Sequence, residues 1–181
     1  RRRGEKQRPR REAARRILVV TEGTRTEPQY VERLNTYLRS KASTTIVKSV
    51  GVGEDPLRVV KKCVELRGAA AISEKAYDMC VCLVDVDSHA TLDAAVTLAR
   101  REGVQLLISN VKFEVWLRWH AEDKRSALTS SQLDTQVEKL KLIKDKILAL
   151  HFPFDAVEDA CEIARLADPD LGPGRKGPNP S

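Results

Sequence analysis

Two short apolar runs that end abruptly at acidic residues place the strongest constraint on the fold of this chain. Residues 17–20 are soon followed by Glu22, and residues 79–84 are followed directly by Asp85 and Asp87. Unbroken runs of this length that contain β-branched residues are typical of strands covered on both faces. Such strands occur in α/β proteins, so the sequence predicts a mainly parallel sheet flanked by helices.

Amphipathic helix patterns separate the predicted strands. Residues 26–38 begin with a threonine that can cap a helix, a proline suited to a first turn and a glutamine near the capping-box position. Apolar spacing predicts further helices over residues 56–64 and 92–99, and shorter apolar runs predict strands over residues 45–50 and 104–108. Strands that alternate with helices imply crossover connections between parallel strands.

The second half of the sequence carries helical patterns. Residues 113–120 place two aromatic residues, a leucine and a histidine on one face of a helix. Apolar spacing over residues 133–148 predicts a longer helix, and residues 156–166 predict another. The predicted fold class is therefore α/β, with a helical C-terminal part.

Length and composition favour one folded domain over residues 17–167. A chain of 181 residues with 41% hydrophobic residues is long enough for one buried core and short for two. Residues 168–181, rich in proline and glycine, are expected to be flexible or to begin a further segment. No apolar stretch approaches the roughly 20 residues of a membrane span, and the start lacks the apolar core of a signal peptide. We therefore expect a cytoplasmic protein.

The basic character of the chain comes from its first residues. Residues 1–16 hold nine basic and two acidic side chains, a net charge of +7, whereas the remainder holds 23 basic and 24 acidic side chains. We expect a basic flexible tail. Such a tail can neutralise phosphates, but arginine runs of this kind are often simply solvated, and both interpretations stay open.

The four cysteines are expected to be buried, reduced thiols. Cys63, Cys80, Cys82 and Cys161 lie within apolar helix or strand patterns, and no C-x-x-C pair suggests a zinc site.

Asp85, Asp87 and Glu22 are the main candidates for chemistry. Side chains two apart on a strand point to the same side, and two carboxylates placed in this way repel each other unless a cation lies between them. Oxygen ligands of this kind suit Mg²⁺ or Mn²⁺. Glu22 follows another predicted strand, so all three acids converge if the two strands are neighbours. An isolated Asp-x-Asp pair, by contrast, is often only a helix cap or a loop start.

Several short motifs follow one another over residues 17–120. They are Val19-Val20-Thr21-Glu22-Gly23, Glu22-Gly23-x-x-Thr26-Glu27-Pro28-x-Tyr30, Gly51-x-Gly53, Asp85-Val86-Asp87 and Ser109-Asn110-x-x-Phe113-Glu114-x-Trp116-Leu117-x-x-His120. The first motif and Asp85-Val86-Asp87 match the two motifs of the Toprim fold, and the whole set resembles, in order and spacing, the RloB-like family of Toprim-fold proteins. Val111 is a departure, because the family usually has proline there.

The resemblance implies a Toprim-like (Rossmannoid) domain and a metal-dependent nuclease of bacterial anti-phage, abortive-infection or restriction systems. It implies Mg²⁺ or Mn²⁺ bound by Asp85 and Asp87, with Glu22 as a ligand or general acid/base. The expected substrate is DNA or a structured RNA such as tRNA. In some cases it also implies an ATPase partner. Apart from the resemblance, a homo-oligomer stays open and no membrane partner is expected.

Three further residues are candidates for the same site. Glu114 is a further acid for a second metal ion, and its alternative is a solvent-facing residue paired with Arg118 at i+4. His120 is a candidate for proton transfer, and its alternative is a buried histidine with satisfied hydrogen bonds. Glu27 either contributes to the site or only favours the helix dipole.

Arg25, Lys112 and Arg118 are candidates for phosphate contact, and Trp116 is expected in the core. His89 lies near Asp87 but has no necessary role. The alternative function is a non-catalytic Toprim-like module that binds nucleic acid or an ATPase partner. A primase-like or topoisomerase-like role is weaker, because those activities depend on other domains.

Overall fold

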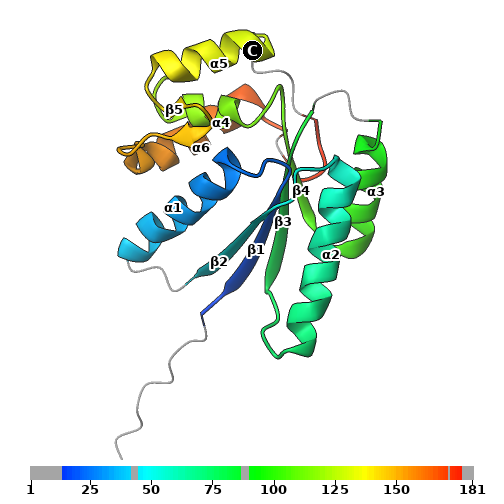
Figure 1. Ribbon diagram of the computed structural model, residues 1–181. Helices are drawn as coiled ribbons and strands as arrows, with labels where there is room; N and C mark the ends of the chain where they lie inside the picture. The colour runs from blue at the N-terminus through cyan, green and yellow to red at the C-terminus, as the bar shows by residue number, and fades with distance from the viewer. Residues whose placement is uncertain (1–13, 42–44, 87–89, 171, 177–181) are drawn as a thin grey trace, which may run out of the picture.

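A four-stranded parallel sheet forms the centre of the protein in a computed structural model that describes residues 14–41, 45–86, 90–170 and 172–176 (Figure 1). The strand order is β2-β1-β3-β4, and every neighbouring pair is parallel. The strands are β1 (Arg16–Thr21), β2 (Ile46–Gly51), β3 (Met79–Asp85) and β4 (Gln105–Ser109).

Helices cover both faces of this sheet, and the predicted fold class is confirmed. Helix α1 (Thr26–Ser40) lies on one face, and α2 (Pro56–Ile72) and α3 (Leu92–Glu102) lie on the other (Figure 1). Leu18 and Val20 pack into the core with α2 and α3, whereas Val19 packs into the core on the α1 side. This division follows from the alternation of side chains along a strand.

The second half of the chain forms a layer that lies over α1, at the carboxyl ends of the strands (Figure 1). It contains α4 (Glu114–Trp119), α5 (Ser130–Lys139), a 3₁₀ turn (Phe154–Ala156) and α6 (Val157–Ala167). Between α5 and the 3₁₀ turn lies an antiparallel hairpin of β5 (Ile143–Lys144) and β6 (Ile147–Leu148).

The prediction of one long helix over residues 133–148 is wrong. Helix α5 stops at Lys139, and three later residues have left-handed backbone conformations: Lys141 (φ 56°), Asp145 (φ 50°) and Lys146 (φ 64°). The apolar residues Ile143 and Leu148 are nevertheless buried, because they face the core from the hairpin. The predicted helix also placed Ile147 on its buried stripe, whereas the hairpin leaves Ile147 54% exposed.

The cysteines and the residues near the two ends of the chain were also the subject of predictions. All four cysteines are free, as expected, and Cys63, Cys80 and Cys82 are buried, but Cys161 is only half-buried. In the segment predicted to be flexible, Gly174 donates a backbone hydrogen bond to Leu106 (2.6 Å). The basic residues 1–13 lie outside the described residues. Within the described part of the chain, no helix is long and apolar enough to cross a membrane.

Gly51 allows β2 to end close to the loop that follows β1. A Cβ atom at this position would lie 2.7 Å from the carbonyl oxygen of Gly23 and 2.8 Å from Cα of Thr24. Backbone hydrogen bonds from Val52 to Thr21 and from Gly53 to Glu22 fix the same junction at 2.9 Å. The Gly-x-Gly motif therefore supports the loop that carries Glu22.

We predict that Gly51→Ala lowers the free energy of unfolding by about 1–3 kcal/mol, because the added methyl group overlaps backbone atoms. Gly68→Ala is the matched control, since a Cβ at Gly68 in α2 meets nothing within 4 Å. That control should stabilise the protein by up to about 1 kcal/mol through helix propensity. Urea unfolding measures the free energy of unfolding of both variants. A Gly51→Ala variant as stable as the wild type would contradict the close approach of β2 to the loop after β1.

Candidate active site

Glu22 and Asp85 lie side by side at the carboxyl ends of neighbouring strands. Strand β1 pairs directly with β3, with Thr21 opposite Leu83. The backbone N–H of Glu22 donates to the carbonyl of Leu83, and Oε2 of Glu22 accepts a hydrogen bond from the backbone N–H of Asp85, both at 2.9 Å. The adjacency on which the predicted convergence of acids depended is therefore present.

Glu27 brings a third carboxylate to this place from the first turn of α1. Its carboxylate group lies so close to Gly23 that a Cβ atom on Gly23 would overlap it. The glycine after Glu22 therefore makes room for the second glutamate. The local geometry favours the site interpretation of Glu27 over a role confined to the helix dipole.

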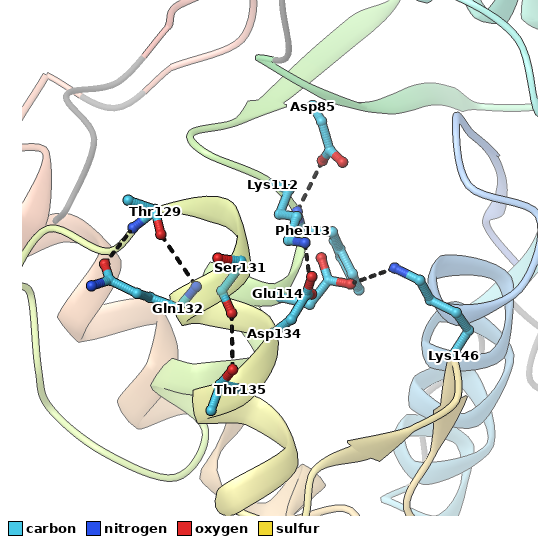
Figure 2. A network of polar contacts seen from close by, with 10 residues as sticks. All are labelled: Asp85, Lys112, Phe113, Glu114, Thr129, Ser131, Gln132, Asp134, Thr135 and Lys146. Carbon is cyan, nitrogen blue, oxygen red and sulfur yellow. Dashed lines mark hydrogen bonds and ion pairs between the residues drawn. The ribbon is translucent and has the colours of Figure 1, made fainter.

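Glu114 is the fourth acid, and it is buried. Its side chain is 7% exposed, and Oε1 forms an ion pair with Nζ of Lys146 at 3.5 Å (Figure 2). The alternative of a solvent-facing Glu114 paired with Arg118 is wrong, because Arg118 pairs with Glu122 at 2.7 Å. One residue earlier, the backbone N–H of Phe113 donates to Oδ1 of Asp85 at 2.9 Å, which ties the start of α4 to the end of β3.

The charges of these acids act on one another. Burial, with the negative charges of Glu27, Glu22 and Glu114, raises the pKa of Asp85 from 3.8 to about 8. Burial also raises the pKa of Glu27, and Glu114 and Glu22 add to that effect. Burial alone would lower the pKa of Lys146, but Glu114, Asp134 and Glu27 raise it. The four carboxylates thus form one electrostatic unit with Lys146 as a nearby cation.

The chemistry of this donor set fits a hard divalent cation. Carboxylate oxygens are the usual ligands of Mg²⁺ and Mn²⁺, and mutual repulsion among buried acids is relieved by such an ion. Among the described residues, no three acidic, thiol or imidazole groups are already arranged to hold a metal ion. Asp87, the second member of the Asp-x-Asp pair, and His89 lie outside the described residues.

His120 lies in an aromatic cluster with both ring nitrogens hydrogen-bonded. Nδ1 lies 2.9 Å from the carbonyl oxygen of Trp116, and Nε2 lies 3.0 Å from the hydroxyl of Tyr30. Because a carbonyl only accepts, Nδ1 carries the proton and Nε2 accepts from Tyr30. Burial lowers the pKa of His120, which agrees with a neutral ring. This geometry favours the satisfied, buried histidine over proton transfer.

The three predicted phosphate-binding cations differ in position. Arg25 is exposed immediately before α1. Lys112 is buried and pairs with Asp134 at 2.6 Å (Figure 2), and Arg118 is buried against Glu122. Only Arg25 of the three presents its charge at the surface. Trp116 packs partly buried against the core, as expected.

Lys146 is the residue of this site that sequence reasoning missed. It stands 32 positions from Glu114 in a stretch whose apolar spacing resembled a helix. The only local signal is an Asp145-Lys146 pair between short aliphatic runs, which is weak without asparagine or glycine at the turn. A tertiary contact, rather than a motif, brings this lysine to the acids.

The fold and these acids define an α/β protein with an acidic site at the carboxyl edge of its sheet. Residues 17–174 match the RloB-like protein family, so the chain belongs to that family, as its motifs suggested. Comparison with curated proteins found no match. The departure at Val111 coincides with a cis peptide bond between Asn110 and Val111.

We predict that the Asp85 carboxyl costs the metal-free protein stability as pH rises from about 4 to 8. Because the folded-state pKa of Asp85 is raised, the folded protein retains a proton at this group that the unfolded chain releases in this window. Asp85→Asn should remove this contribution and raise the free energy of unfolding at pH 8 on the order of 1–3 kcal/mol relative to the wild type. Urea unfolding in EDTA checks this, with Asp159→Asn on the exposed surface of α6 as the control. Parallel pH profiles for wild type and Asp85→Asn would contradict the shift.

We also predict that Tyr30→Phe lowers the free energy of unfolding by about 1–2 kcal/mol, because Nε2 of His120 loses its buried partner. Tyr37→Phe is the control, since no hydrogen bond of its hydroxyl occurs among the described residues. Thermal unfolding measures both variants. Unchanged stability of Tyr30→Phe would contradict the hydrogen bond between Tyr30 and His120.

Proposed function

We propose that this protein is a Mg²⁺-dependent nuclease that hydrolyses phosphodiester bonds of DNA or RNA in defence against phage. The observation that carries the proposal is the gathering of Glu22, Glu27, Asp85 and Glu114 at the carboxyl edge of the sheet. Membership of the RloB-like family supports it. The defence setting rests on the resemblance described above.

The acids have distinct roles in this proposal. Asp85 and Asp87 hold the metal ion, and Glu22 is a further ligand or the general acid/base. Glu114 and Glu27 add negative charge next to these groups. The bound cation would supply charge neutralisation on the phosphate oxygens and a more acidic water molecule.

Backbone groups of the chain orient the two strand-end acids. The N–H of Phe113 holds Oδ1 of Asp85, and within the described part of the chain Oδ2 has no hydrogen-bond partner. The N–H of Asp85 in turn holds Oε2 of Glu22. A backbone N–H of a strand or a helix start thus orients each of these two carboxylates, which is the kind of support that preorganised sites require.

The first test is binding of Mg²⁺ or Mn²⁺ by titration calorimetry. The wild-type protein should bind, Asp85→Asn and Asp85→Asn/Asp87→Asn should lose at least about tenfold in affinity, and Asp159→Asn should match the wild type. Asp159 is exposed on α6 and carries the same chemical change away from the sheet edge. A folded wild type that binds neither ion would contradict the proposal.

The second test is cleavage of plasmid DNA, single-stranded DNA and tRNA. We expect hydrolysis that requires Mg²⁺ or Mn²⁺, stops in EDTA and falls by at least about 100-fold in Glu22→Gln and Asp85→Asn. Circular dichroism should show both variants folded. Nucleic-acid binding that survives EDTA without any cleavage would support the non-catalytic module instead.

A further inference from the structure

The hairpin formed by β5 and β6 carries one side chain into the acid cluster. Its two-residue turn, Asp145-Lys146, has both residues in the left-handed region, at φ 50° and 64°. Left-handed conformations at both turn positions are the type I′ arrangement, in which asparagine and glycine are usual and lysine is not. The turn therefore has a lysine where backbone preference alone would select another residue.

Helix α1 clamps the backbone of this turn. The hydroxyl of Thr26 and the amide of Gln29 both donate to the carbonyl of Lys146, each at 3.1 Å. The same Gln29 side chain accepts from the backbone N–H of Leu148 at 3.0 Å and donates to the carbonyl of Arg25 at 2.9 Å. Lys146 and Arg25 are thus held at the same end of α1, next to Glu27.

The ammonium of Lys146 can accept a further partner besides Glu114. The Lys146 side chain is 57% exposed, whereas its partner Glu114 is 7% exposed, and their 3.5 Å separation is long for a charge-assisted hydrogen bond. Lys112 shows the contrast, because it is 11% exposed and pairs with Asp134 at 2.6 Å. An ammonium has three donors, so Lys146 can bind another anion at the rim of the site while it stays near Glu114.

We propose that Lys146 is a substrate-contacting residue of the site and that its ammonium binds a non-bridging oxygen of the phosphate to be cleaved. This inference rests on the nuclease function proposed above. The hairpin fixes the backbone of Lys146 at the N-terminus of α1, and its 57% exposed side chain extends to the buried Glu114. A phosphate that binds beside the acids would lie close to this cation.

The test compares three variants in the intact chain with Mg²⁺ and with the nucleic acid that the wild type cleaves. Lys146→Met should keep Mg²⁺ affinity within about threefold and lower kcat by about 100-fold or more, as expected for loss of one charge-stabilising donor. Lys146→Arg should retain part of the activity, because it restores the positive charge. Lys144→Met should cleave like the wild type, since Lys144 is an exposed lysine of the same hairpin.

The outcomes separate this inference from the proposed function. Wild-type cleavage with Mg²⁺ but unchanged kcat in Lys146→Met would overturn the role of Lys146 and leave the nuclease intact. Absence of Mg²⁺ binding and cleavage in the wild type would overturn the nuclease, and the role of Lys146 with it. If Lys146→Met unfolds and Lys146→Met/Glu114→Gln folds again, the lysine is only the counter-ion of a buried glutamate, and the inference fails.

Discussion

The site depends on β1 and β3 being adjacent parallel strands that end at the same edge of the sheet. Their pairing places the residue after β1 beside the last residue of β3, where the side chain of Glu22 accepts a hydrogen bond from the backbone of Asp85. A sheet in which another strand separated these two would move the acids apart by the spacing of a strand, nearly 5 Å. The order β2-β1-β3-β4 is therefore what brings Glu22 and Asp85 together.

Much of this arrangement could be predicted from the sequence, because its determinants are local. The apolar runs predicted the strands of the sheet, and the acids that follow two of these runs predicted a site at the carboxyl ends of the strands. The motif residues also have identifiable contacts: Gly23 makes room for Glu27, Thr26 binds the hairpin turn, and Tyr30 bonds to His120. The hydrogen bond between Tyr30 and His120 joins the first and last motifs across 90 residues of sequence.

The remaining features could not be predicted, because they arise from contacts between distant segments. The hairpin was mistaken for a helix because Ile147 and Leu148 continue the apolar spacing of α5. In the structure Ile147 is exposed, and the left-handed turn residues before it end any helix. The surroundings of the buried Glu114 likewise depend on a distant residue, because its partner Lys146 lies 32 positions away on the hairpin. Lys146 combines both difficulties, since its turn conformation is unusual and its acidic partner is far away in sequence.

The balance of charge in the acid cluster links these two halves of the chain. Lys146 alone cannot offset four buried or half-buried carboxylates. Burial is the main cause of the raised pKa values of Asp85 and Glu27, and the neighbouring carboxylates add to it. In the function proposed here, a divalent cation among the acids would make up the deficit, and Glu114 would then attract the lysine less strongly. The ammonium would become more available to a phosphate once the site is loaded. The same acids would then control both metal binding and the availability of the Lys146 ammonium for a phosphate of the substrate.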